Sequence, residues 1–174
     1  RMLKQPAAER FKLLRESSNP QAQFLWSIFR DVWHYVALHL ADIADNARDL
    51  DFAIRWGFGW NEGPFESWQA AGWKQIADWI SEDIAAGKTL CSAPLPAWVS
   101  QVDGVHKPEG SYSAAKNAYI GRSKLPVYAR QPFKQAVLGE NAPDLRTAGS
   151  TVFEDESIRL WTAPGADDVL VASF

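Results

Sequence analysis

Three closely spaced glycines, Gly57, Gly59 and Gly63, are the first residues whose spacing could bind a ligand. Glycine-rich turns can hold the phosphates of a dinucleotide, because backbone N–H groups approach the ligand where no side chain intervenes. The spacing here is G-x-G-x-x-x-G, which is one residue too long, and it follows a helical pattern where the fingerprint follows a strand. We therefore expect these glycines to let helices turn and pack closely around aromatic neighbours.

Two histidines could act as general bases. His34 follows Asp31 by three residues and His39 precedes Asp42 by three, so each could hydrogen-bond a carboxylate along a helix. The two histidines are five residues apart and point in different directions, so they cannot bind one metal ion as an i, i+4 pair can. No activated nucleophile lies beside either histidine in the sequence. The pattern therefore favours structural histidines at a helix packing edge.

The other reactive residue types are not arranged for chemistry. Asp42, Asp45 and Asp49 lack the residue order and the closing Glu of a calcium loop, which indicates capping carboxylates. Cys91 is the only cysteine and has no His or Lys nearby to activate it, so an internal disulfide and a cysteine zinc cage are excluded. We predict no catalytic, cofactor-binding or metal-binding residue in this chain, and a reducing, cytoplasmic compartment.

The elements that must position these residues are mainly helical. Asn19 and Pro20 supply an N-cap and a first helical residue, and apolar residues then recur at spacings of three and four as far as Ile43. Leu25, Ile28, Val32 and Tyr35 widen this apolar stripe, which implies contacts on more than one side of the helix. Further helices are predicted over Leu50 to Trp56, capped by Asp49 and ended by Gly57, over 64–72 and 73–86, ended by Gly72 and Gly87, and as one turn over 96–99.

The second half of the chain carries weaker patterns. Tyr119-Ile120 and Pro126 to Ala129 could form short edge strands, and Ser157 to Trp161 with Val169 to Phe174 predict a β-hairpin. The predicted fold is mainly α, with an extended tail and a terminal β-hairpin. The expected segments are an N-terminal arm (1–18), a helical domain (19–104), an extended connector (105–150) and the start of a further domain (151–174).

Composition limits the class of protein. The chain has 174 residues, 47% hydrophobic and 22% charged, which is typical of a globular protein. Its net charge of −3 disfavours a nucleic-acid-binding protein. The longest uncharged apolar stretch, 32–41, is far shorter than the ~18 residues of a membrane span. The apolar run 169–174 lacks a pairing strand after it, which predicts a piece of a longer polypeptide.

One segment carries a family resemblance. Residues 49–68, DLDFAIRWGFGWNEGPFESW, resemble the signature of the helical C-terminal domain of 3-hydroxyacyl-CoA dehydrogenases, in which an acidic residue and a glycine pair precede G-P-F and a short helix. With the flanking helices, the resemblance covers about residues 19–90. Residues 151–174 resemble the linker and first strands of an enoyl-CoA hydratase, or crotonase-like, domain.

The resemblance implies a piece of a multifunctional fatty-acid β-oxidation enzyme, an oxidoreductase that converts 3-hydroxyacyl-CoA to 3-ketoacyl-CoA with NAD. The family's NAD-binding domain and catalytic residues are absent here, and Ser27 and Ile28 replace the Asn and Arg of its G-F-I-x-N-R pattern, so the chain resembles a degenerate second repeat. Its implied partners are an upstream NAD-binding domain and a downstream crotonase-like domain of the same parent chain, the acyl-CoA substrate and a second copy in a homodimer. The interface or cleft residues expected from this signature are Phe58, Trp60, Gly63, Pro64, Phe65 and Trp68.

A second interpretation stays open. The wide apolar stripe and the many aromatic residues also suit a non-enzymatic helical docking scaffold that joins catalytic domains and touches no substrate. Binding of acyl-CoA by this chain distinguishes the two interpretations, because only a cleft-forming domain contacts the substrate.

Overall fold

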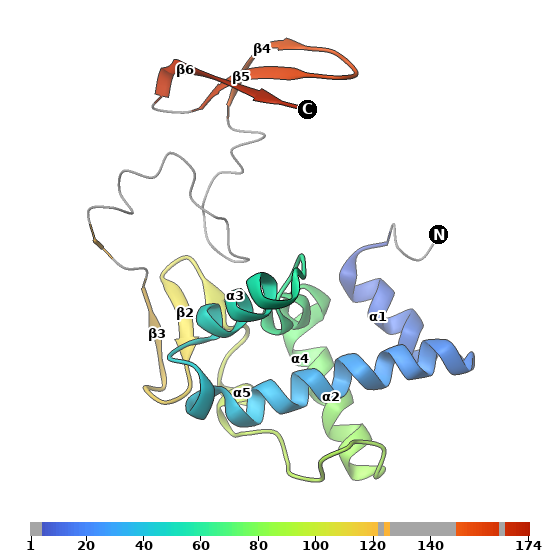
Figure 1. Cartoon of the computed structure of the whole chain (residues 1–174). Coiled ribbons are helices and arrows are strands. Elements are labelled where there is room, and N and C mark those ends of the chain that lie inside the picture. Colours follow the sequence, from blue (N-terminus) through green and yellow to red (C-terminus); the bar gives the residue numbers. More distant parts are fainter. Residues whose placement is uncertain (1–4, 122–123, 126–148, 164–165) are drawn as a thin grey trace. The chain divides into compact units, whose positions relative to one another are not determined.

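A computed structural model of the chain describes residues 5–121, 124–125, 149–163 and 166–174 (Figure 1). Residues 1–121 and 122–174 form two compact units. The first unit holds five helices and a small sheet, and the second holds a three-stranded antiparallel sheet in its described residues. The prediction of a mainly helical fold with a terminal hairpin is confirmed. The predicted edge strand over Pro126 to Ala129 lies outside the described residues.

The helices of the first unit pack around one another (Figure 1). α1 and α4 both contact α2, and α3 packs on α4. The sheet β1-β2-β3 is antiparallel and its central strand packs against α3. The elements are α1 (Ala7–Glu16), α2 (Pro20–Ile43), α3 (Ala47–Phe58), α4 (Pro64–Ala85), α5 (Trp98–Gln101), β1 (His106–Lys107), β2 (Gly110–Ser113) and β3 (Ala118–Ile120).

Helix boundaries agree with the sequence at α2 and differ at α3. The Asn19 side chain accepts a hydrogen bond from the Gln21 N–H and begins α2, as predicted. The predicted Asp49 cap of α3 is wrong, because the Asn46 side chain accepts from the N–H groups of Arg48 and Asp49 instead. The predicted end at Gly57 is also wrong. Gly59 adopts the left-handed conformation, φ 70°, and α3 runs two residues further.

The break predicted at Gly72, between helices over 64–72 and 73–86, is confirmed as a kink within α4. Gly72 has φ 104° and ψ 97°, so the chain bends there and continues as a helix. A glycine adopts this conformation without the steric strain that a Cβ would cause. The Trp68 indole N–H donates to the Trp73 carbonyl across the bend, at 2.9 Å, which satisfies one of the carbonyl groups near the kink. The single turn predicted over 96–99 is confirmed as α5, Trp98–Gln101.

Residues 106–120 form a sheet in a part of the chain where the sequence favours an extended connector with one short edge strand, Tyr119-Ile120. That strand is confirmed as β3, and the other two strands were not predicted. Lys107 pairs with Gly110 and Tyr112 with Tyr119 across antiparallel strands. The short strands gain stability from the helices, because the buried Tyr112 ring stacks on Trp98 with centroids 5.1 Å apart. Local sequence patterns give little information about stabilisation of this kind, which comes from tertiary contacts.

Tryptophans dominate the core of the first unit. Trp33 and Trp68 are fully buried, and the Trp68 and Trp73 rings stack with centroids 4.3 Å apart. Buried aromatic rings contribute large apolar areas, and their offset packing adds about 0.5–1.5 kcal/mol per pair. Trp73 in turn lies 5.9 Å from Trp98, so the aromatic packing is continuous from α2 to the small sheet.

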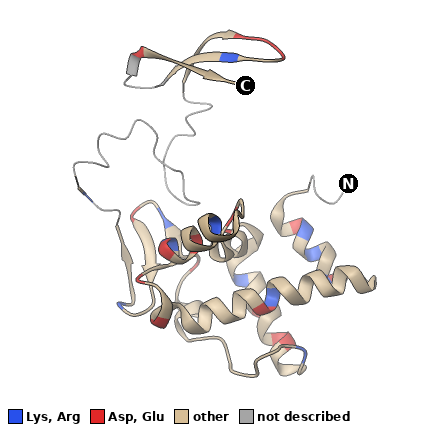
Figure 2. Cartoon of the chain, in the orientation of Figure 1, with Lys and Arg blue, Asp and Glu red and all other residues tan. Residues whose placement is uncertain are grey.

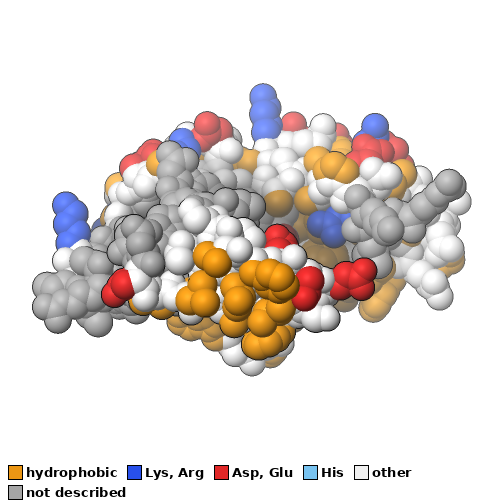
Figure 3. Space-filling model, turned by 90° about the horizontal axis from the view of Figure 1, so that it is seen from above, with side chains coloured by type: hydrophobic (Ala, Val, Ile, Leu, Met, Phe, Trp, Pro, Cys, Tyr) orange, Lys and Arg blue, Asp and Glu red, His pale blue; other side chains and the backbone are white. Residues whose placement is uncertain are grey.

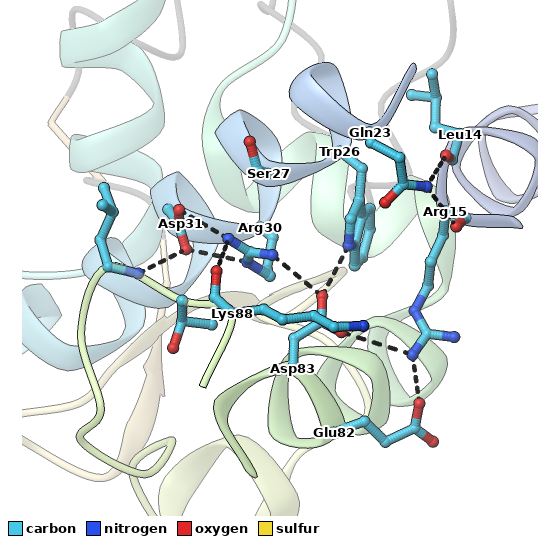
Figure 4. A network of polar contacts seen from close by, with 12 residues as sticks. Leu14, Arg15, Gln23, Trp26, Ser27, Arg30, Asp31, Glu82, Asp83 and Lys88 are labelled. Carbon is cyan, nitrogen blue, oxygen red and sulfur yellow. Dashed lines mark hydrogen bonds and ion pairs between the residues drawn. The ribbon is translucent and has the colours of Figure 1, made fainter. Parts of the chain in front are cut away.

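The buried side chain of Asp83, near the end of α4, forms hydrogen bonds with two residues of α2 (Figure 4). Asp83 accepts hydrogen bonds from the Trp26 indole N–H at 2.8 Å and from Arg30 at 3.2 Å. Arg30 also donates to the Lys88 carbonyl at 2.7 Å and pairs with Asp31. Because these buried groups satisfy one another, the network holds the loop after α4 against α2.

The second unit is a sheet with exposed apolar residues. Its strands are β4 (Ser150–Glu154), β5 (Arg159–Ala163) and β6 (Ala166–Ser173), in the order β4-β5-β6. Trp161 is buried and donates its indole N–H to Ser173. Figure 3 shows hydrophobic side chains gathered beside acidic ones on one face of the molecule. The exposed large apolar residues of this unit, among those that the structure describes, are Leu125, Val152, Phe153, Val169, Leu170 and Phe174.

Candidate functional site

The segment that resembles the dehydrogenase signature is organised by the carboxylate of Asp51. This residue lies on α3, and its two oxygens accept hydrogen bonds from the Phe65 and Glu66 N–H groups, both at 2.9 Å. Pro64, the first residue of α4, has no N–H to satisfy. Asp51 therefore caps α4 from a different helix, and its negative charge lies at the positive end of the α4 dipole.

Gly63 is required by the same packing. A Cβ atom at this position would overlap the Asp51 side chain, well inside van der Waals contact. The Gly63 N–H donates to the Glu66 carboxylate at 2.7 Å, and Arg55 pairs with Glu66 at 3.1 Å. The acidic residue and the G-P-F of the signature thus form a helix junction, in which each residue type has a structural reason.

His106 extends this junction to the small sheet. Its Nε2 lies 2.7 Å from an Asp51 oxygen and its Nδ1 lies 2.8 Å from the Ser111 hydroxyl. A neutral ring that donates from Nε2 to Asp51 accepts at Nδ1 from the Ser111 hydroxyl. Burial raises the pKa of the Asp51 carboxyl, and hydrogen bonds from His106 and the Phe65 N–H oppose this rise.

Asp51, His106 and Ser111 are arranged like the carboxylate, the general base and the hydroxyl nucleophile of a catalytic triad. All three side chains are buried in the described structure, at 2% exposure or less. A substrate cannot reach a hydroxyl that is buried in this way. The arrangement therefore acts as an internal polar connection between α3, α4 and β2.

No motif in the sequence points to His106 or Ser111. Asp51 and His106 are 55 residues apart, and no short motif joins them. The signature contains an acidic residue before G-P-F, but the sequence does not indicate which side chains contact that residue. The contact depends on the packing of the small sheet against α3.

The six residues expected at an interface or cleft fall into two groups. Gly63, Pro64, Phe65 and Trp68 are buried within the first unit. Phe58 and Trp60 are exposed, at 73% and 45%.

Phe58 and Trp60 belong to a larger exposed group that we call the aromatic surface. Trp56, on the same helix end, is 68% exposed and its ring stacks on Phe52 at 4.8 Å. The guanidinium of Arg55 lies over the ring of Phe52. The aromatic surface consists of the exposed Trp56, Phe58 and Trp60, at the end of α3 and in the turn before α4, together with the half-buried Phe52 one turn earlier in α3.

His34 and His39 occupy different environments. His34 is buried and its Nε2 lies 2.8 Å from the Ala93 carbonyl, so it has a structural partner. Asp31 pairs with Arg30 rather than with His34. His39 lies at the surface, with its Nδ1 3.8 Å from an Asp42 oxygen, beyond hydrogen-bond distance. The structure does not bring the two histidines together.

The described residues contain no cluster of three or more His, Cys, Asp or Glu that could hold a metal ion. Cys91 is exposed and carries a free thiol. None of the described helices has the length and apolar character needed to cross a membrane.

Comparison with known proteins supports the dehydrogenase resemblance. Over 93 residues, or 53% of the chain, the sequence is 34% identical to a protein of Bacillus subtilis (strain 168) described as a probable 3-hydroxyacyl-CoA dehydrogenase. The matched region is 11% of that relative, so the chain corresponds to a small part of its length. No family model matches the chain. No solved structure matches it either.

Proposed function

We propose that this chain is the helical C-terminal part of an enzyme that oxidises 3-hydroxyacyl-CoA to 3-ketoacyl-CoA with NAD. In this proposal it supplies packing and interdomain contacts and one wall of the acyl-CoA cleft, and the catalytic residues lie elsewhere in the parent protein. The observation that carries the proposal is the 34% identity over 93 residues to the Bacillus subtilis protein.

The helix junction supports this assignment. In the described structure, Asp51, Gly63 and Glu66 are satisfied by one another and by the backbone of α4. Such a junction stabilises the packing of α3 against α4. The resemblance over 49–68 is therefore explained by packing, as expected for a domain that keeps the family's architecture without its chemistry.

The glycine-rich turn before α4 offers few free N–H groups to a dinucleotide such as NAD. The Gly63 N–H is already bonded to Glu66, and Gly57 lies within α3 rather than in a turn after a strand. A pyrophosphate needs free N–H groups at the start of a helix, and those of Phe65 and Glu66 are bonded to Asp51. We place the NAD site in an upstream domain of the parent and a crotonase-like domain downstream of this chain.

The aromatic surface is the part of the chain that we assign to the cleft. Phe58 ends α3 and Trp60 lies in the turn between α3 and α4, the two helices that Asp51 connects, and both side chains are exposed. Exposed aromatic groups of this kind mark ligand or protein contact sites more often than isolated apolar residues do. We also place the second unit, with its exposed apolar strands, at the start of the downstream domain.

Titration of the 174-residue chain with a 3-hydroxyacyl-CoA, followed by tryptophan fluorescence and calorimetry, tests this function. We expect saturable binding that free CoA does not reproduce, and no NADH when NAD is added. Trp60→Ala should weaken binding at least about tenfold. The matched control is Phe24→Ala, which removes a similarly exposed aromatic side chain from α2.

Two results would contradict the proposal. Binding that Trp60→Ala leaves unchanged would remove the aromatic surface from the cleft. Complete absence of binding would favour the helical docking scaffold, which touches no substrate.

A further inference from the structure

The helix junction is connected to the aromatic surface by a chain of contacts. The carboxylate of Glu66, which is buried at the start of α4, accepts a hydrogen bond from Arg55 at 3.1 Å. The guanidinium of Arg55 lies 5.6 Å from the centre of the Phe52 ring. That ring stacks on the ring of Trp56, with centroids 4.8 Å apart and planes inclined by 10°. Each of these side chains therefore contacts the next, from the junction outward.

The exposure of the side chains increases along this chain of contacts. Glu66 is buried, the side chain of Arg55 is 19% exposed, Phe52 is half-buried and Trp56 is 68% exposed. A side chain as exposed as that of Trp56 samples several rotamers unless a neighbouring group packs on it. The stack on Phe52 supplies that contact, so the orientation of the exposed indole depends on Phe52.

The contacts follow from the spacing of the residues on α3. Trp56 is four residues after Phe52 and Arg55 is three residues after it, so both side chains are neighbours of the Phe52 ring on the helix surface. Figure 2 shows acidic and basic residues along α3, and Arg55 is the basic residue of its last turn. The helix dipole favours a cation there. The dipole does not require an aromatic ring beside that cation, so the contact with Phe52 has a separate reason.

Arginine has the shape that this position requires. Its planar guanidinium can pair with a carboxylate while it also contacts an aromatic ring. The ammonium group of a lysine pairs with a carboxylate as a compact charge and has no planar face. A lysine at position 55 could therefore keep the ion pair with Glu66 without holding the Phe52 ring.

We propose that Arg55 is a positioning residue for ligand binding, which acts through Phe52 and fixes the indole of Trp56 in the orientation that contacts the acyl group of a 3-hydroxyacyl-CoA. The inference rests on the proposed function and names the residue that sets the geometry of the cleft wall. Arg55 itself does not touch the substrate. Its effect is preorganisation, because a ring that is already ordered loses less conformational freedom when the ligand binds.

The affinity of the 174-residue chain for a 3-hydroxyacyl-CoA, measured by calorimetry, is the first test. Arg55→Gln should weaken binding about two- to tenfold, the range for ordering one side chain on binding. Arg55→Lys should recover little of this loss, because it restores the charge without the planar face. Arg15→Gln is the matched control and should leave the affinity unchanged. Arg15 pairs with Glu82 and lies over the ring of Trp79, so this variant removes the same kinds of contact outside the aromatic surface.

A double-mutant cycle tests whether Arg55 acts through Trp56. Trp56→Ala should weaken binding at least as much as Arg55→Gln does, and Arg55→Gln should have no further effect in the Trp56→Ala background. A role of Arg55 in the fold alone would instead give additive losses.

The mobility of the Trp56 ring gives a readout without ligand. The indole N–H resonance of Trp56, assigned by its loss in Trp56→Phe, should show increased fast motion by 15N relaxation in Arg55→Gln. The resonance of the fully buried Trp33 should not change. This measurement separates the positioning of one ring from a general loosening of the fold.

Phe52→Leu provides a second route to the same comparison. Arg55→Gln removes the partner of the buried Glu66 carboxylate and so also lowers stability. Phe52→Leu leaves that ion pair in place and removes the stack, so it should reproduce both the loss of affinity and the mobility of Trp56. Circular dichroism shows whether each variant is folded.

Three results would overturn the inference and leave the proposed function standing. They are additive losses in the cycle, full affinity of Arg55→Lys, and unchanged Trp56 relaxation in both Arg55→Gln and Phe52→Leu. Absence of any binding by the unmodified chain would instead overturn the proposed function and this inference together.

Discussion

An oxygen of Asp51 on α3 lies 2.7 Å from Nε2 of His106 on β1, and both side chains are buried. The same carboxylate caps α4 through two backbone N–H groups. One side chain thus connects two helices and a strand that are far apart in sequence. Removal of its charge should therefore affect the first unit as a whole.

Asp51→Asn preserves the shape of this side chain and replaces one acceptor oxygen by a donor. The new amide faces N–H groups of α4 or of His106, so at least one buried donor is left without an acceptor. We expect a loss of about 1–3 kcal/mol in the free energy of unfolding, the range for leaving a buried hydrogen-bond donor without a partner. Urea denaturation measures it, with Asp42→Asn at the surface as the control, which should change stability by less than about 0.5 kcal/mol.

Two glycines of the signature should respond in opposite ways to the same substitution. Gly63→Ala places a methyl group against the Asp51 side chain and should cost about 1–3 kcal/mol, as overpacked cores do. Gly57→Ala meets no atom within 4 Å and lies inside α3, so it should stabilise the protein by up to about 1 kcal/mol. Thermal denaturation of the two variants checks this. Equal shifts of Tm would contradict the structural reason given for Gly63.

Some parts of this structure follow from local sequence signals and others do not. The Asn19 cap and the apolar period of α2 are local signals, and both are confirmed. The Asp51 cap of α4 is not local, because the residue that supplies it lies on another helix. A local pattern therefore predicts helices well and cannot predict which side chain closes the junction between them.

The same distinction explains the errors at α3 and the missed part of the site. Asn46 and Asp49 are both good N-cap residues, and only the backbone geometry decides between them. Phe58 and Phe65 are both apolar aromatics near the signature, and tertiary packing alone leaves the first exposed and the second buried. His106 and Ser111 lack any motif, so their contact with Asp51 follows only from the three-dimensional fold.

Stability should fall in mild acid because of His34. Burial lowers the pKa of its imidazole from the ordinary value of 6.5, so the unfolded chain binds a proton at a higher pH than the folded protein. This contribution to stability is fully present above about pH 6.5 and is lost as pH falls through the folded-state pKa. One such proton changes the free energy of unfolding by at most about 1.4 kcal/mol per pH unit.

Urea denaturation between about pH 7.5 and pH 5 measures this slope. His34→Gln should be less stable than the unmodified chain at neutral pH, through loss of the bond to Ala93, and should show a shallower decline in acid. His39→Gln, at the surface of the same helix, is the matched control and should leave the His34-dependent slope in place. An unchanged slope in His34→Gln would show that other groups cause the acid sensitivity.

Iodide should quench the fluorescence of the aromatic surface selectively. Trp56 and Trp60 are the most exposed tryptophans of the described residues, whereas Trp33 is fully buried. Because iodide quenches by collision in water, the double variant Trp56→Phe, Trp60→Phe should lose most of the quenchable emission, while Trp33→Phe should retain it. Both variants keep an aromatic ring, so the fold should not change at the aromatic surface. If the double variant is quenched as strongly as the unmodified chain, this surface is covered in solution, and neither acyl-CoA nor a neighbouring domain can contact it there.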